Sequence, residues 1–404
     1  MKTWRGSWVA MAAGGAIALA ACVTAPAAAE GVAEAVAAPA PGALLSVQPT
    51  PVPATLPHAA ERSVITYRSR GVRGEPIVVS GYALLPTGQP PQGGWPVLAW
   101  AHGTTGVADT CAPSGDYAGG PVHDYQLLMD QSLDGWLAQG YAVVATDYQG
   151  LGTPGGHPYM DAASQLHTVD DSVRALHRLR PGAFSVDWLV MGHSQGGAAA
   201  LAVAAKGQQD VPEFKLRGAI AAAPGGFRYS AILAYLRANP RPPLGVALFF
   251  PIMLEGADVA DPGLRVDRLV SADMQPLVTL ARSRCMSELR EEVKSAPASV
   301  FKPDADLAPL EAYFERQGIE RMVPRVPLML VQGSADALVD ARGIRAYYQQ
   351  VCKNGSNIFY HDVPGGDHRA SLQASAQAAK AFLAQLDGQG KLASCAALPA
   401  PGGQ

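Results

Sequence analysis

The chain has 404 residues and a net charge of −3, with 16% charged and 48% hydrophobic residues. This length allows one large domain with an insertion, or two modest domains. The balanced charge argues against nucleic-acid binding, because such proteins carry a basic stripe and none is visible here. The 43 glycines and 33 prolines are typical of a fold with many turns.

The first residues have the pattern of an export signal. Lys2 and Arg5 precede an apolar stretch over residues 8–21, which is too short and too rich in Ala and Gly to span a membrane. The stretch ends in LAAC, which resembles the lipobox of bacterial lipoproteins and makes Cys22 the expected site of lipidation. We therefore expect a signal peptide over residues 1–22 and a lipoprotein held on the membrane, in the periplasm or at the cell surface. Cleavage after residue 29, giving a secreted protein, is the alternative.

The mature part of the chain divides into three segments. Residues 23–58 are rich in Ala and Pro and predict a flexible tether. Residues 59–395 are expected to form the folded domain, and residues 396–404 a flexible tail. We expect a monomer.

Apolar runs alternate with helical patterns along the domain, which predicts an α/β fold. In chain order we expect strands at 77–85 and 95–101, a helix at 128–139, a strand at 141–146, a helix at 163–179, a strand at 186–191, a helix at 198–205, strands at 218–223, 326–331 and 357–363, and a helix at 370–386. The first strand is expected to be antiparallel. The alternation predicts right-handed crossovers and a mostly parallel central sheet flanked by helices.

One long stretch interrupts this alternation. Residues 227–313 carry helical patterns and an apolar run with prolines at 242–254, PPLGVALFFPIML. Its position before the last strands favours an inserted helical cap, and the alternative is that the run belongs to the buried core.

The sequence GHSQGG at 192–197 contains the pattern G-x-S-x-G between an expected strand and an expected helix. Such a turn is so tight that side chains near the serine would collide, and it lifts the serine hydroxyl above the sheet. This predicts Ser194 as a nucleophile. The backbone N–H of Gln195, at a helix N-terminus, is then expected to face a developing oxyanion.

A serine nucleophile needs a base, which in this arrangement follows it in the chain. Only His361 and His368 follow Ser194. His361 lies inside the last expected strand, where a structural role is more common. His368 lies in the loop PGGDH before a helix, so it is the predicted base.

The acid that orients the base is expected at the end of the preceding strand. The sequence GSADALVD at 333–340 supplies Asp336 first, in the pattern G-x-x-D-x-x-V, and Asp336 is the predicted acid. Asp340 is interpreted as a helix-start or surface residue. Asp367 is too close to His368 in sequence to orient it easily.

A second oxyanion donor is expected in HGTTG at 102–106, after the strand at 95–101. Gly103 lets the backbone approach the substrate, and Thr104 is favoured over Thr105 as the donor of an N–H. His102 precedes the serine and is interpreted as a structural residue of the loop. Asp147, in DYQGLG, is interpreted as a support for the same loops.

Four cysteines remain once Cys22 is set aside. An even number in an exported chain predicts two disulfides, and buried free thiols are the alternative. Three pairings stay open among Cys111, Cys285, Cys352 and Cys395.

Several motifs together resemble the secretory lipase family of lipase-A-like fungal and bacterial enzymes. They are HGTTG, CAPS at 111–114, DYQGLG at 147–152, GHSQGG, and GSADALV before PGGDH. The resemblance extends from about residue 95 to 370 and implies an α/β-hydrolase fold with a helical cap and hydrolysis of carboxylic esters, including acylglycerols. It also implies disulfides that join Cys111 to Cys285 and Cys352 to Cys395. A lipoprotein anchor is not a general mark of that family. This departure weakens the inference that the protein hydrolyses lipids in oil droplets.

These features predict an exported serine esterase or lipase that acts through an acyl-enzyme at Ser194. A triacylglycerol lipase is one of the enzymes that this prediction covers. The apolar run at 242–254 would suit an acyl chain. The alternatives are a serine peptidase of the same fold and a non-catalytic binding protein at the cell surface. No cofactor or metal motif is present in the sequence, so the expected partner is an ester or lipid substrate.

Overall fold

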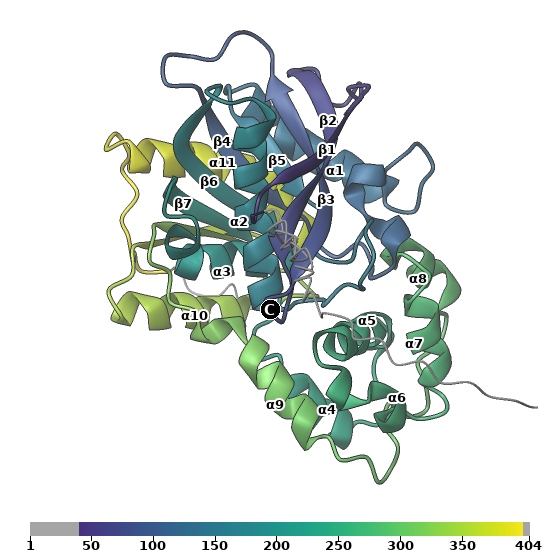
Figure 1. Cartoon of the computed structure of the whole chain (residues 1–404). Helices are drawn as coiled ribbons and strands as arrows, with labels where there is room; N and C mark the ends of the chain where they lie inside the picture. The colour runs from purple at the N-terminus through teal and green to yellow at the C-terminus, as the bar shows by residue number, and fades with distance from the viewer. Residues whose placement is uncertain (1–39, 399–404) are drawn as a thin grey trace, which may run out of the picture. The chain divides into compact units, whose positions relative to one another are not determined.

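The computed structural model describes residues 40–398. The predicted signal peptide, Cys22 and the first part of the predicted tether lie outside these residues. Within these residues, nine strands form one sheet in the order β1-β2-β3-β5-β4-β6-β7-β8-β9. Figure 1 labels the strands β1 to β7 and the helices around them. The strands are β1 Leu44–Thr50, β2 Ala59–Arg70, β3 Pro76–Pro86, β4 Trp95–Ala101, β5 Ala142–Thr146, β6 Phe184–His193, β7 Lys215–Ala222, β8 Leu328–Gly333 and β9 Ile358–Val363.

The sheet is parallel from β5 through β4 to β9 and antiparallel at its N-terminal edge, from β1 to β3 and between β3 and β5. This confirms the mostly parallel α/β fold and the antiparallel first expected strand. The flanking helices are α1 His123–Leu137, α2 Ala162–Leu179, α3 Gln195–Asp210, α10 Ala341–Lys353 and α11 His368–Leu386.

The expected tether is wrong in its last part, because β1 lies within residues 23–58. This strand pairs with β2 at the sheet edge, and all of its side chains are at least partly exposed. An edge strand with no buried face has no alternation of apolar residues, so its sequence gives no strand signal. The next strand, β2, also lies outside the expected elements, although Ile65 and Tyr67 alternate with more exposed residues along it.

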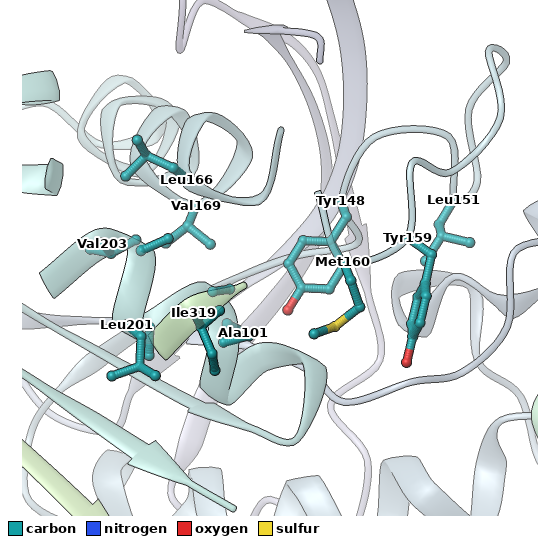
Figure 2. Packing of buried hydrophobic residues seen from close by; sticks show 14 of the residues in the cluster. Ala101, Tyr148, Leu151, Tyr159, Met160, Leu166, Val169, Leu201, Val203 and Ile319 are labelled. Atoms are coloured by element: carbon teal, nitrogen blue, oxygen red, sulfur yellow. The ribbon is translucent and has the colours of Figure 1, made fainter. Parts of the chain in front are cut away.

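The hydrophobic core lies on both faces of the sheet. Successive side chains of β4 alternate between them, with Val97 and Ala99 on one face and Leu98 and Trp100 on the other. Helices α2 and α3 cover the first face, where their apolar side chains pack with those of the loop after β5 (Figure 2). Helices α1 and α11 cover the second face.

Six helices lie between β7 and β8, over the range expected to form a cap. They are α4 Ala231–Ala238, α5 Leu244–Ala260, α6 Val266–Leu269, α7 Gln275–Ala281, α8 Met286–Glu292 and α9 Ala308–Gln317, drawn in green in Figure 1. The apolar run at 242–254 forms most of α5, and its Phe250 packs edge-on against Phe301 and Phe314 from the same insertion. No helix within residues 40–398 is long and apolar enough to cross a membrane.

Both disulfides implied by the family resemblance are present. Cys111 pairs with Cys285 and so ties the loop after β4 to the residue before α8. Cys352 pairs with Cys395, which ties the end of α10 to the segment after α11.

Candidate active site

Ser194 occupies the sharp turn between β6 and α3. Its backbone has φ 59° and ψ −113°, outside the regions that non-glycine residues normally adopt. A Cβ atom at Gly192 would collide with the carbonyl oxygen of Gly196, and a Cβ at Gly196 would collide with that of Ala101. Only glycine fits these two positions, so the GHSQGG motif holds Ser194 in a strained turn, as its sequence predicted.

His368 and Asp336 are brought together beside this turn. His368 is the first residue of α11, and its Nδ1 lies 2.8 Å from Oδ2 of Asp336. The other carboxylate oxygen of Asp336 accepts hydrogen bonds from the backbone N–H groups of Leu338 and Val339, both at 2.9 Å. Burial alone would raise the pKa of Asp336, but the bonds from His368 and the two amides more than offset it and lower the pKa. Asp336 is therefore ionised, so its carboxylate accepts the hydrogen bond from Nδ1–H of His368.

The other acidic and histidine candidates have different partners. Asp340 caps α10 by accepting a hydrogen bond from the N–H of Arg342, and Asp367 caps α11 through the N–H of Ala370. His361 lies in β9, and burial lowers its pKa. None of the three carries the contacts of a catalytic acid or base.

Ser194 and His368 line the same two pockets. Among the described residues, no hydrogen bond joins the Ser194 hydroxyl to the His368 ring. Hydrogen bonds between a nucleophile and its base are often long without substrate and tighten when it binds.

The two expected oxyanion loops meet at the same place. Gln195 is the first residue of α3, where the backbone N–H has no partner within its own helix. Thr104 lines a pocket with Ser194, and its hydroxyl hydrogen-bonds the Tyr159 hydroxyl at 2.7 Å. Thr105 is buried, and its carbonyl accepts the N–H of Met286 at 2.8 Å.

His157, which the sequence did not single out, holds the side chain of Gln195. Burial lowers the pKa of His157 to about 3, so its ring is neutral. Nδ1 donates to the carbonyl of Gln149, 2.8 Å away, and Nε2 then accepts from the amide of Gln195 at 2.9 Å. The DYQGLG loop thus supports the residue that follows the serine.

A second unforeseen feature is a chain of hydrogen bonds from the HGTTG loop to His368. Burial lowers the pKa of His193 to about 3, so this ring is neutral and carries one hydrogen. Its Nε2 faces the carbonyl oxygen of His368 at 3.0 Å and must carry that hydrogen. Nδ1 therefore accepts from the Tyr125 hydroxyl at 2.8 Å, and the same hydroxyl accepts the N–H of Gly103 at 3.0 Å. His193 is visible in GHSQGG, whereas Tyr125 has no sequence signal.

His102 and Asp147 have the supporting roles expected of them. The His102 ring hydrogen-bonds the carbonyl of Gly103 at 2.7 Å. The buried Asp147 carboxylate accepts from the hydroxyl groups of Ser80 and Ser114 and from the Ser114 N–H. Both residues stabilise the loops behind the site.

Two pockets of different character open on Ser194. The charged pocket, a cavity of about 300 Å³, is lined by Thr104, Asp124, Tyr125, Arg290, Glu291 and Arg369 among others. The apolar pocket, about 410 Å³, is lined mainly by Tyr159, Met160, Tyr229, Ile232, Val246, Phe249, Phe250 and Met253. No group of three or more His, Cys, Asp or Glu residues within 40–398 is arranged to hold a metal ion.

Two family models match the sequence. The model described as secretory lipase matches residues 273–391, and the model described as serine aminopeptidase, S33, matches residues 122–301. A probable inactive lipase of Mycobacterium tuberculosis is 24% identical over 328 residues, which cover 76% of this chain and 69% of that protein.

Solved structures with the same fold include lipase A of Candida antarctica, with a TM-score of 0.73 and 19% identity, covering 90% of this chain and 86% of that one. The rice cell wall degrading esterase LipA of Xanthomonas oryzae aligns with a TM-score of 0.68 and 21% identity, covering 87% of this chain and 100% of that one. At these identities the structural likeness establishes the fold.

Proposed function

We propose that this chain is a serine carboxylic-ester hydrolase with Ser194, His368 and Asp336 as its catalytic triad, because it has the α/β-hydrolase fold and matches the secretory lipase model over residues 273–391. The observation that carries the proposal is the 2.8 Å hydrogen bond from His368 to the solvent-inaccessible carboxylate of Asp336, beside a serine held at positive φ. The three residues occur in the order Ser, Asp, His, as in other hydrolases of this fold.

In the proposed reaction, Ser194 Oγ attacks the ester carbonyl carbon while His368 Nε2 takes the hydroxyl proton. Asp336 fixes the tautomer of His368 and stabilises the imidazolium. The backbone N–H groups of Gln195 and Thr104 hold the oxyanion. His368 then gives its proton to the leaving alcohol, and water activated by the same ring releases the acid.

The apolar pocket supports a hydrophobic acyl group. It begins at Ser194 and His368 and continues along Phe249, Phe250 and Met253 of α5. The fit of an alkyl chain there excludes water from apolar side chains, which stabilises the bound ester. We assign the acyl group to this pocket and the alcohol to the charged pocket.

The protein is proposed to act outside the cytoplasm. The two disulfides support this, because they persist in oxidising compartments. Anchoring through a lipidated Cys22 remains part of the proposal, and mass spectrometry of the mature N-terminus tests it.

A serine peptidase is the second candidate, and the match of residues 122–301 to the serine aminopeptidase model favours it. Asp124 and Glu291 in the charged pocket could hold a peptide amino group. The relation to a probable inactive lipase keeps a non-catalytic binding protein as a third outcome.

One experiment separates these candidates. Hydrolysis of 4-nitrophenyl esters from acetate to palmitate and of aminoacyl 4-nitroanilides is measured with the native protein and with Ser194→Ala. Ester hydrolysis that is lost in Ser194→Ala supports the proposal, and the chain-length profile distinguishes esterase from lipase. Cleavage of the anilides alone favours the peptidase, and no turnover of either class favours the binding protein.

A further inference from the structure

The charged pocket places two arginines beside the proposed catalytic serine. Arg290 belongs to α8 of the insertion, and Arg369 follows His368 in α11. Both line the cavity that Ser194 and His368 also line, and both remain accessible to solvent. The same cavity is thus lined by one arginine from the insertion and one from the helix that begins at His368.

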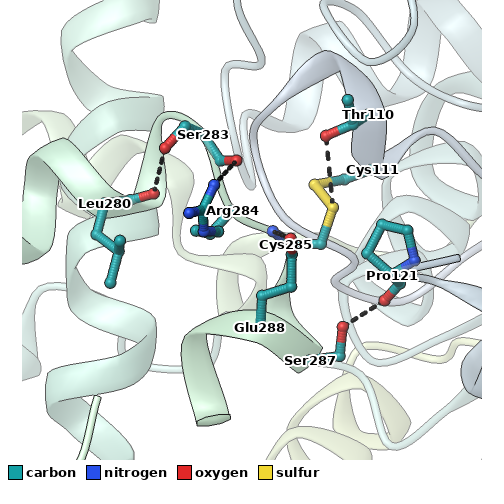
Figure 3. Close-up of a disulfide and its surroundings, with 9 residues drawn as sticks. All are labelled: Thr110, Cys111, Pro121, Leu280, Ser283, Arg284, Cys285, Ser287 and Glu288. Atoms are coloured by element: carbon teal, nitrogen blue, oxygen red, sulfur yellow. Dashed lines mark hydrogen bonds between the residues drawn. A yellow bond between two sulfur atoms is a disulfide. The ribbon is translucent and has the colours of Figure 1, made fainter. Parts of the chain in front are cut away.

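Helix α8 is fixed to the rest of the site by covalent and hydrogen bonds. The Cys111–Cys285 disulfide holds the residue before the helix (Figure 3). Cys285 also forms an antiparallel bridge with Gly106. The Ser287 hydroxyl donates to the carbonyl of Pro121, as Figure 3 shows. Arg290, one turn further along α8, is therefore held at a defined place relative to the HGTTG loop.

Neither arginine of the charged pocket has an ion pair or a side-chain hydrogen bond among residues 40–398. Two other arginines near the start of α8 do: Arg282 pairs with Glu255 at 2.8 Å and Arg284 with Glu292 at 2.6 Å. Partial desolvation of its guanidinium group and the like charge of Arg369 lower the pKa of Arg290. Within the part of the chain that the structure describes, Arg290 and Arg369 therefore have no acidic partner, whereas the nearby arginines of the insertion do.

Two carboxylates, Asp124 and Glu291, also line the pocket. No ion pair within the described residues joins either of them to Arg290 or Arg369. The carboxylates are not paired with the arginines, so an anionic ligand would find two guanidinium groups whose hydrogen-bond donors are not used by a protein side chain of residues 40–398. Guanidinium groups bind carboxylate and phosphate oxygens through paired hydrogen bonds.

We propose that Arg290 and Arg369 form an anion-binding subsite, distinct from the oxyanion hole. The subsite selects esters whose alcohol carries a carboxylate or a phosphate. This inference rests on the proposed function, in which the alcohol occupies the charged pocket. The negative group binds between α8 and α11, while the ester carbonyl lies at Ser194 and the acyl chain enters the apolar pocket.

Matched substrates test the subsite through activity. We compare the hydrolysis of 3-(butanoyloxy)benzoate with that of its uncharged analogue 3-(butanoyloxy)benzamide by measuring the phenol that each releases. The phosphate ester 3-(butanoyloxy)phenyl phosphate is compared with the same amide. We expect kcat/KM to be about tenfold higher for the better anion than for the amide. The ratio should fall toward one in Arg290→Gln and Arg369→Gln, and in the native protein at high ionic strength, because salt screens exposed charges.

Arg237→Gln is the matched control, because Arg237 is an arginine of the same insertion that pairs with Glu311 and lies outside the charged pocket. It should keep the native ratio. Equal rates on the charged and uncharged esters, or a ratio unchanged in both pocket variants, would overturn the subsite while leaving ester hydrolysis in place.

Binding provides a readout that does not depend on turnover. In the Ser194→Ala background, calorimetry should detect tighter binding of the anionic ester than of the amide, and adding Arg290→Gln or Arg369→Gln should remove the difference. If the native protein hydrolyses none of these esters but this difference is present, the proposed function fails and the subsite stands. If Ser194→Ala binds the two esters equally, the subsite fails whatever the hydrolysis result.

Discussion

The Tyr125 hydroxyl donates a hydrogen bond to Nδ1 of His193, 2.8 Å away, although the two residues are 68 positions apart in the chain. Through this bond the HGTTG loop is connected to the residue before Ser194. The opposite nitrogen of the same ring donates to the backbone carbonyl of His368. One neutral imidazole therefore links the loop of the proposed oxyanion donor to the proposed base.

Replacing Tyr125 by Phe removes this link at little cost in volume. We expect kcat to fall about fivefold to tenfold with little change in KM, because the Gly103 N–H and His193 Nδ1 lose their partner and the loop shifts. Kinetics with 4-nitrophenyl butyrate measure the effect. Tyr117→Phe is the control, since Tyr117 is 65% exposed. An unchanged kcat in Tyr125→Phe would show that the link does not position the site.

Asp336→Asn should keep the fold and reduce kcat by about three to four orders of magnitude, because the amide favours the wrong tautomer of His368. Asp340→Asn is the matched control four residues away, since Asp340 only caps α10 and pairs with Arg342. Steady-state rates of both variants on one ester decide the assignment. Equal activity of the two variants would mean that Asp336 is not the acid.

Gly196→Ala should destabilise the protein by several kcal/mol, because the new Cβ has no room beside the Ala101 carbonyl. Gly135→Ala, in α1, should instead stabilise it by about 0.5–1 kcal/mol, since that position is open and helical. Urea unfolding measures both changes. A native-like stability of Gly196→Ala would contradict the collision.

Stability should decrease as the pH falls from about 6.5, in part because of His193. Its pKa is about 3 in the folded protein against 6.5 for an ordinary histidine, with His368, Arg369 and Asp336 as the charged or titratable neighbours that act on it. The unfolded chain therefore binds a proton that the folded chain does not, and stability present above pH 6.5 is lost as the pH falls toward 3. The loss for this one group is about 1.4 kcal/mol per pH unit. His193→Asn should make urea unfolding less dependent on pH between 7.5 and 5, and an identical dependence would refute the burial of a neutral His193.

Removing the two disulfides should have different consequences for activity. Cys111 and Cys285 hold α8 against the HGTTG loop, so a double Ser variant of this pair should lower kcat/KM as well as stability. The double Ser variant of Cys352 and Cys395 removes a cross-link between residues 43 positions apart, neither of which lines a pocket at Ser194. It should lower stability by about 2–4 kcal/mol while keeping kcat/KM. Thermal unfolding and ester kinetics on both variants test this. Equal kcat/KM in the two would show that the first disulfide does not set the geometry of the site.

The sequence by itself determined the parts of this protein that depend on local geometry. A strand, a tight turn with glycines and a helix specify where Ser194 lies, because no other residue fits at Gly192 and Gly196. The parallel strands were recognisable because both of their faces are buried, which makes them short apolar runs. The positions of Asp336 and His368 followed from strand ends, where parallel sheets collect their functional residues.

The tertiary structure alone decided features that join distant segments. The edge strand β1 depends on pairing with β2, since its own side chains are largely exposed. The link from Tyr125 through His193 to His368 joins residues separated by 68 and 175 positions. Arg290 and Arg369 share a pocket because α8 packs beside the loop after β4, to which the Cys111–Cys285 disulfide joins it. Such contacts depend on how crossovers and insertions pack, and no local pattern of residues encodes them.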